Sequence, residues 1–249
     1  MINIPVEAVL ALAVAGLYLK DSACLLHSDE AVLTASHLGS RSPRWRAAFG
    51  ARNWRLAGKE PWLPNPFTPQ RAAWRLRWRM DGEQAPAAPA AGQALQARPA
   101  LRRLAPFVWV AWVCLLVGVP VGLLSRAGPQ LAIAAAGVAY VNAIVALALV
   151  WRWREALGLP PKAFGGLAFE CLSCIPYSIN LLRKVAAAHT PPEDFALAAQ
   201  RLLPPAEWAA AQAQCLLRLD EQLDAEAEGS ARSTALQAAR ARFGGGPAA

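Results

Sequence analysis

The sequence predicts a membrane protein that is mainly α-helical, with about three transmembrane helices, a small β-rich cytoplasmic module and C-terminal cytoplasmic helices. The chain has 249 residues, of which 55% are hydrophobic and 17% are charged. Soluble domains carry about 25% charged residues, so this excess of apolar residues points to a bilayer. Two uncharged stretches near the middle of the chain, with basic residues clustered before them, complete the basis for this fold class.

The two uncharged stretches predict a transmembrane helical hairpin. Phe107–Ser125 and Leu131–Trp151 contain no Asp, Glu, Lys or Arg. Their lengths match the about 20 apolar residues that a helix needs to cross a hydrocarbon core of about 30 Å. A buried helix pair of a soluble protein is the alternative, but soluble helices are rarely apolar on every side. Gly118 and Gly122 have the spacing that lets two membrane helices approach closely.

A weaker candidate span lies at the N-terminus, in Ile2–Leu19. It has no basic residues before its apolar part, Glu7 interrupts it, and Cys24 follows a poor lipoprotein cleavage signal. A retained membrane anchor is therefore preferred to a cleaved signal peptide. Together with the hairpin this anchor makes three spans, so the two ends of the chain should lie on opposite sides of the membrane.

Basic residues predict the orientation of these spans, because Lys and Arg are enriched in cytoplasmic loops. More than half of the 25 Lys and Arg residues lie between Lys20 and Arg103, whereas the turn of the hairpin holds only Arg126. The N-terminus should therefore lie outside, with the long loop and the C-terminus in the cytoplasm. The abundance of Arg, Ala and Pro is typical of a GC-rich bacterial genome, so we expect a multi-pass protein of the bacterial inner membrane.

The stretch AAWRLRWRM, residues 72–80, alternates apolar and basic side chains with the period of two that is typical of a β-strand. A helix capped at Thr68 is the alternative. As a strand, its tryptophans would cover a small core and its arginines would face water. Arginine and tryptophan both favour an anionic membrane surface, which makes this stretch a candidate lipid-surface site. Its residues are Trp74, Arg75, Arg77, Trp78 and Arg79.

The same arginines have two other interpretations. They can simply be solvated side chains that satisfy the cytoplasmic charge bias. They also suit nucleic-acid binding, since arginine with aromatic residues fits phosphates and base stacking. Nucleic acid is nevertheless not an expected partner, because attachment to the membrane already explains a basic excess on the cytoplasmic side.

Cys171 and Cys174 form a CxxC motif beside Glu170. Such a pair can be a redox couple or half of a zinc site. No second pair supplies the remaining zinc ligands and no βαβ pattern surrounds the motif, so two small apolar residues on a helix are the simpler interpretation. The surrounding stretch, Leu167–Lys184, is expected to be an amphipathic helix at the inner interface rather than a fourth span. The five scattered cysteines predict reduced thiols.

Glu7 and Asn142 are polar residues inside predicted spans. Such residues are costly in lipid, and one interpretation is a proton or ion pathway. The preferred interpretation is simpler: Glu7 reaches water at the outer interface, and Asn142 forms a hydrogen bond with a neighbouring helix. A transport pathway normally needs more than three spans.

The C-terminal region predicts two helices separated by Pro204 and Pro205, the first capped at Thr190. The second helix has one apolar face and an acidic end around Asp220 and Glu221. This acidic end should contact either the basic loop or a partner, unless it is only a solvated surface. Residues 229–249 are rich in Gly, Ala, Arg and Ser and are expected to be disordered.

These predictions divide the chain into six segments. They are an anchor (1–19), a basic Trp/Arg-rich cytoplasmic module (20–83), an Ala/Pro-rich linker (84–104), the transmembrane hairpin (105–152), a cytoplasmic or interfacial helical region (153–228) and the disordered tail (229–249).

The expected function is that of an integral inner-membrane accessory or scaffold protein. It would bind a protein partner or a second copy through its C-terminal helices, and membrane lipids through the basic module. A membrane-bound enzyme using Glu170, Cys171 and Cys174 is one alternative, and a small transporter or channel subunit is the other. No catalytic residue and no cofactor are predicted, because the sequence contains no nucleophile–base pair, phosphate-binding loop or dinucleotide motif.

Overall fold

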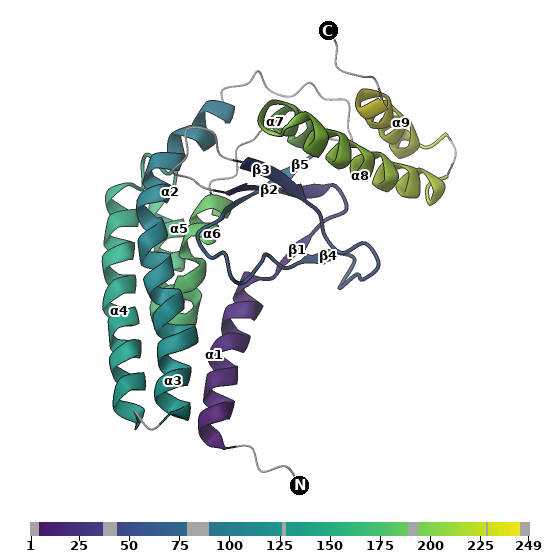
Figure 1. Cartoon of the computed structure of the whole chain (residues 1–249). Coiled ribbons are helices and arrows are strands. Elements are labelled where there is room, and N and C mark those ends of the chain that lie inside the picture. Colours follow the sequence, from purple (N-terminus) through teal and green to yellow (C-terminus); the bar gives the residue numbers. More distant parts are fainter. Residues whose placement is uncertain are drawn as a thin grey trace. The chain divides into compact units, whose positions relative to one another are not determined.

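The computed structural model describes residues 5–36, 44–78, 90–125, 128–188, 194–227 and 229–244 (Figure 1). Arg79, Arg126 and Thr190, which the sequence analysis singled out, lie outside the described residues. The chain is about 67% helical with a small sheet part, which confirms the mainly helical fold class. It divides into two compact units.

The first unit, called the helical unit, consists of Met1–Cys24, Leu63–Ala72 and Gln96–His189. Its helices are α1 (Val6–Ser22), α2 (Ala90–Val113), η1 (Cys114–Gly118), α3 (Val119–Leu124), α4 (Gly128–Arg152), α5 (Pro161–Ser173), η2 (Ile175–Asn180) and α6 (Leu181–Ala188). Two helices are long and apolar enough to cross a membrane: Pro99–Leu124, which joins α2, η1 and α3, and Gly128–Arg152. Within the described residues α1 does not qualify, because it has only 17 residues.

The two long helices form the predicted hairpin and lie side by side in Figure 1. Gly122 allows the close approach, since a Cβ atom on it would lie 2.4 Å from the backbone nitrogen of Ala132. The π-helical segment η1 ends just before Pro120, whose missing N–H removes one helical hydrogen bond. Buried apolar residues of α1, α2, η1, α3, α4 and η2 form one core: Tyr18, Ala111, Leu115, Val119, Ala135, Ala139 and Ile179.

The second unit, called the mixed unit, consists of Leu25–Trp62, Ala73–Leu95 and Thr190–Ala249. Its strands are β1 (Cys24–Leu26), β2 (Glu30–Ser36), β3 (Arg44–Ala48), β4 (Glu60–Trp62) and β5 (Ala72–Arg77). β1 pairs with β4, and the order β3–β2–β5 forms a three-stranded sheet in which β2 and β3 are antiparallel, with Leu33 opposite Ala47. The strand predicted within residues 72–80 is thus confirmed as β5.

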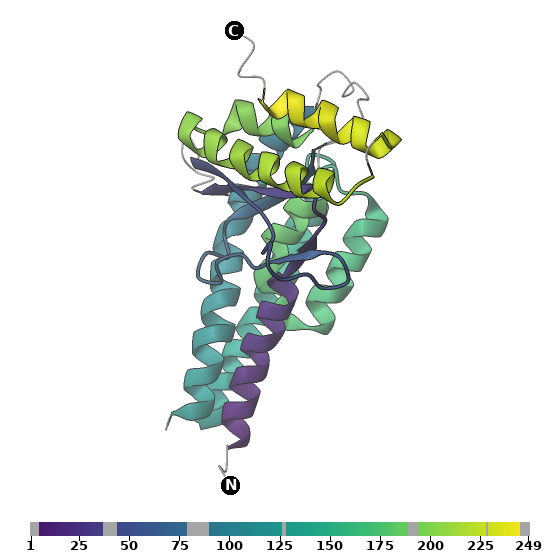
Figure 2. The same ribbon diagram turned by 90° about the vertical axis from the view of Figure 1, so that its right-hand side faces the viewer.

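Three C-terminal helices complete the mixed unit: α7 (Phe195–Leu202), α8 (Pro205–Asp224) and α9 (Ala231–Gly244). The break between α7 and α8 falls at the predicted pair of prolines, and Asp194 caps α7 by accepting a hydrogen bond from the backbone N–H of Ala196. In both views α9 lies alongside α8 (Figure 1 and Figure 2).

Three segments differ from the sequence analysis. The expected disordered tail contains α9, which is ordered because Leu236, Ala239 and Phe243 share one helix face and are buried. The expected linker is helical from Ala90 onward, because its alanine-rich sequence continues into α2. The single amphipathic helix expected over Leu167–Lys184 is broken into α5, η2 and α6 around a proline that cannot continue a helix.

Candidate functional site

The arginines of β5 bind a buried carboxylate. Glu30 on β2 is 3% exposed, and its Oε2 accepts hydrogen bonds from Arg75 Nε at 2.7 Å and from the backbone N–H of His27 at 2.8 Å. Its Oε1 accepts one from Arg77 Nε at 2.6 Å. Burial by itself raises the pKa of Glu30, but these hydrogen bonds and the charge of Arg75 outweigh it and lower the pKa. Arg75 and Arg77 therefore stabilise the sheet through Glu30.

Trp74 of β5 and Trp78, the residue that follows it, are buried, as expected for the core face of this strand. The lipid-surface role of this stretch stays a prediction. Trp74 and Trp78 are each 1% exposed. Trp74 packs on Trp45 of β3, with ring centres 5.1 Å apart, and Trp78 packs on Phe195 of α7 at 5.9 Å. Alternation along β5 correctly indicated a strand with one core face. Residues of β3 and α7 cover that face.

A buried ion pair joins the N-terminal and C-terminal parts of the mixed unit. Arg218 of α8 and Glu60 of β4 are 3% and 2% exposed, and Arg218 Nη2 lies 2.6 Å from Glu60 Oε2. The same nitrogen donates to the carbonyl of Gly50 at 2.9 Å, and the guanidinium lies over the ring of Phe49. Sequence reasoning missed this pair, since neither residue stands out by local pattern.

Two further ion pairs, both exposed, join the N-terminal and C-terminal parts of the mixed unit. Arg46 Nε lies 3.4 Å from Glu207 Oε1, and Arg52 Nε lies 3.0 Å from Glu221 Oε1. The acidic residues of α8 thus contact the basic segment within the same unit, as one of the predicted alternatives required. These arginines are correspondingly less available to lipid.

In the helical unit, a lysine holds two carboxylates and fixes the broken helices to the end of α1. Lys184 Nζ of α6 lies 2.7 Å from Asp21 Oδ1 and 2.6 Å from Glu170 Oε2. Asn180 Nδ2 donates to Asp21 Oδ2 at 2.9 Å, and the hydroxyl of Ser22 donates to Asn180 Oδ1 at 3.1 Å. The pKa of Lys184 is raised, because the two carboxylates outweigh the opposing effect of burial.

A tight turn at residues 65–68 is held by side chains from three helices. Arg183 Nη2 of α6 donates to the carbonyls of Asn65 and Thr68, both at 2.9 Å. The carbonyl of Pro66 accepts from the Tyr18 hydroxyl of α1 at 2.8 Å and from Trp112 Nε1 of α2 at 3.0 Å. Only tertiary contacts reveal this cluster. Its sequence signal is limited to a proline-rich segment.

The CxxC pair does not have the surroundings of a reactive site. Cys171 is buried, and burial raises the pKa of its thiol to about 12. Cys174 is half-buried, and Glu170 is bound to Lys184. Within the part of the chain that the structure describes, no group of three His, Cys, Asp or Glu residues is placed to hold a metal ion.

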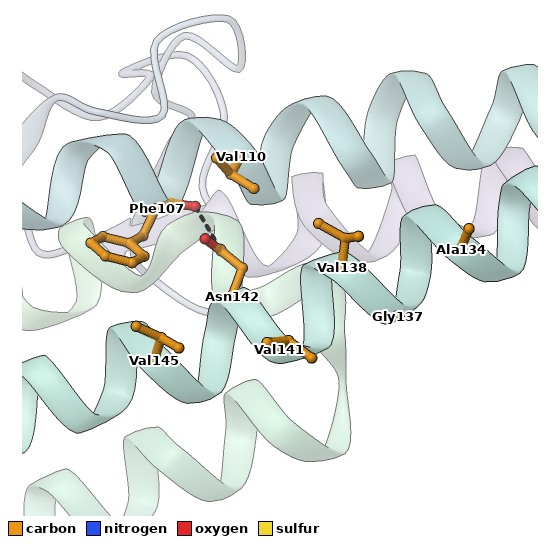
Figure 3. Close-up of a pocket in the computed structure, with 8 residues that line it drawn as sticks. All are labelled: Phe107, Val110, Ala134, Gly137, Val138, Val141, Asn142 and Val145. Carbon is orange, nitrogen blue, oxygen red and sulfur yellow. Dashed lines mark hydrogen bonds between the residues drawn. The ribbon is translucent and has the colours of Figure 1, made fainter.

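The two polar residues of the predicted spans are not brought together. Glu7 is exposed in the first turn of α1. Asn142 Nδ2 of α4 donates to the carbonyl of Phe107 on α2 at 2.8 Å, which is the expected helix–helix hydrogen bond (Figure 3). Asn142 lies in a shallow groove of about 480 Å³ between these helices, and the other side chains lining it are apolar.

Comparisons with known protein families, with curated proteins and with solved structures find no match for this chain.

Proposed function

We propose that this chain is an integral inner-membrane accessory or scaffold protein. In this proposal the helical unit anchors the chain in the bilayer, and the mixed unit binds a partner at the cytoplasmic surface. The observation that carries the membrane part is the outward surface of the two long helices. Their exposed aliphatic side chains are Val110, Val113, Val117, Val121, Leu124, Leu131, Ile133, Val138, Val141, Ile144 and Val145. Exposed apolar surface on this scale is typical of contact with lipid.

We further propose that α1 is the third span and that the N-terminus lies outside. Exposed apolar residues along α1 support this proposal: Val6, Val9, Leu10, Leu12, Leu17 and Leu19. Its 17 residues are at the short end of the range for a span, which local thinning of the bilayer can accommodate.

The chain segments that make up the mixed unit support an even number of membrane crossings between Trp62 and Thr190. Its segments Leu25–Trp62 and Thr190–Ala249 lie on either side of the hairpin in sequence, yet they meet at the Glu60–Arg218 pair. In this proposal both segments lie on the same side of the membrane that the hairpin crosses. Two crossings satisfy this condition. A fourth span within Leu167–Leu182 would violate it.

The partner-binding part of the proposal rests on the C-terminal helices. Leu197 of α7 and Leu217 of α8 remain exposed, although other faces of these helices pack into the mixed unit. A protein partner or a second copy would cover them. The enzyme alternative gains no support from the contacts of Glu170 and Cys171, which are a bound carboxylate and a buried thiol.

Reporter fusions test the topology. Fusions after Glu83 and at the C-terminus should both report cytoplasm, and a tag at the N-terminus should be accessible from outside. A periplasmic signal from the C-terminal fusion would contradict the three-span arrangement.

A pull-down tests the accessory function. The full-length tagged chain, extracted in mild detergent, should co-purify with a stoichiometric protein or as a homo-oligomer, identified by mass spectrometry and native mass. Leu197→Arg with Leu217→Arg should abolish this association, whereas Leu131→Arg on α4 should impair membrane insertion instead. A solitary monomer would contradict the scaffold proposal while leaving the membrane proposal standing.

A further inference from the structure

We propose that the tip of the segment before β4, residues Arg52–Lys59, docks on the anionic lipid surface of the membrane in which the helical unit is anchored. This inference rests on the proposed membrane anchoring. It concerns a different Trp/Arg stretch from residues 74–78, whose tryptophans are buried. The second stretch has the chemistry of an interfacial site, and its apolar side chains are exposed.

The tip is a tight hairpin with a defined backbone. Leu56 and Lys59 exchange two backbone hydrogen bonds, of 2.8 and 3.0 Å, across Ala57 and Gly58. Both central residues have positive φ, 51° and 76°, as in the type I′ turns that join antiparallel strands. At its base, the backbone N–H of Ala51 donates to the carbonyl of Pro61 at 2.8 Å. The structure therefore presents this tip as an ordered element.

Two large apolar side chains project from the tip into solvent. Trp54 is 67% exposed and Leu56 is 56% exposed. They are two residues apart, the spacing that places side chains on one side of an extended chain. Among the described residues, no aromatic ring packs against Trp54. Tryptophan favours the depth of the lipid headgroups, where its ring is shielded and its N–H stays hydrated.

The charges of the tip identify the kind of surface that would cover it. Arg52, Arg55 and Lys59 are its ionisable residues, and it contains no acid. The Arg55 side chain is more than half exposed, and its Nη2 lies 3.8 Å from Glu60 Oε1, which is too far for a hydrogen bond. Arg52 is paired with Glu221. No ion pair forms at Lys59 within the described residues. Arg55 and Lys59 thus remain able to bind lipid phosphates, which complements the apolar pair.

A short connection links the tip to the helical unit in sequence. Leu63, where the chain enters the helical unit, follows Lys59 by only four residues. Four residues reach at most about 14 Å when fully extended.

The test uses the full-length chain in lipid nanodiscs, with an environment-sensitive fluorophore on Leu56→Cys. The half-buried native cysteines are replaced by Ser, and nitroxide-labelled lipids serve as quenchers. The matched control carries the fluorophore on Leu217→Cys, since Leu217 is also an exposed leucine of the mixed unit. In discs with phosphatidylglycerol, the label at residue 56 should be quenched and the label at residue 217 should not.

Charge removal completes the test. Arg55→Gln with Lys59→Gln should lower the docking equilibrium about 25-fold, since each basic residue near an anionic surface contributes a factor of about five. Quenching at residue 56 should likewise fall in discs of phosphatidylcholine alone. Equal quenching with and without phosphatidylglycerol, or no quenching at residue 56, would overturn the proposal. So would a soluble protein partner that binds the wild type and is lost on Trp54→Ser with Leu56→Ser.

Incorporation into the discs separates this outcome from failure of the proposed function. Every variant should co-elute with the discs, because the apolar helices and not the tip would hold the chain in the bilayer. If the wild type does not co-elute, the membrane proposal itself is wrong. If it co-elutes without quenching at residue 56, only the docking of the tip is wrong.

Discussion

Two stretches of the mixed unit alternate tryptophan or leucine with arginine, and the structure treats them in opposite ways. In WRLRW, residues 74–78, the tryptophans are packed under α7 and β3, and the arginines bind Glu30. In WRL, residues 54–56, both apolar side chains are exposed. The first stretch belongs mainly to a strand paired within a covered sheet, and the second leads into a turn from which its apolar side chains stay exposed. Alternation identifies the faces of a stretch, and the neighbouring elements decide whether a face is buried.

The largest expected effect separates the two stretches directly. Trp78→Ala should destabilise the mixed unit by about 3–5 kcal/mol, because it removes a fully buried ring and leaves a cavity. Trp54→Ala should change stability by less than about 0.5 kcal/mol, as is usual for surface positions. Denaturant unfolding of the full-length chain in detergent measures both. Equal losses of stability in Trp78→Ala and Trp54→Ala would contradict this difference between the two stretches.

The ion pairs between the basic segment and α8 extend the comparison to charged residues. Arg218→Met should cost about 3–5 kcal/mol, because Glu60 is left buried without the side chain that forms its hydrogen bond. Arg52→Met, at the exposed pair with Glu221, should cost about 0–1 kcal/mol. Replacing both buried charges, with Arg218→Met and Glu60→Met, should recover much of the loss. The same unfolding measurement serves, and a double variant as unstable as Arg218→Met would contradict the interpretation.

Two glycines make an equivalent pair in the helical unit. Gly122→Ala should cost about 1–3 kcal/mol, because its Cβ would meet the backbone of Ala132 and the helices would have to separate. Gly137→Ala should be tolerated, since nothing lies within 4 Å of the new Cβ. Thermal unfolding of the detergent-solubilised variants, followed by loss of helical signal, distinguishes them. Equal sensitivity would indicate that the close approach at Gly122 is unimportant.

The smallest effect concerns the pH dependence contributed by Glu30. Its pKa is lower in the folded chain than in the unfolded one, where the pKa of a glutamate is about 4.3. The stability that its charge contributes is therefore present above about pH 4.3 and is lost as the pH falls through the folded pKa. The stability difference between wild type and Glu30→Gln should shrink on acidification. A difference that grows at low pH would reverse this assignment.

Several features followed from local pattern alone. The length of the two uncharged stretches located the helices that are long and apolar enough to cross a membrane. Period-two alternation of apolar and basic residues located β5. Paired prolines located the break between α7 and α8, and the polar Asn142 indicated a helix–helix hydrogen bond. Each of these signals depends on residues close together in sequence, so it survives without knowledge of the fold.

The candidate site was far less predictable. Glu30, Glu60 and Lys184 each bind a side chain more than ten positions away, and no local pattern marks these partners. The helix α9 was missed for a related reason, because Leu236, Ala239 and Phe243 are apolar residues in a segment whose average composition resembles disorder.

Sequence alone determined the mainly helical class, the two apolar helices, the strand at residues 72–77 and the charge of each segment. These properties arise from helix and strand periodicity and from the low solubility of apolar side chains in water. Tertiary structure decided which Trp/Arg stretch is buried, which arginines are paired and which remain available, and that the segments flanking the hairpin form one unit. Those outcomes depend on contacts between residues distant in sequence, whose free energies arise only when the chain is folded.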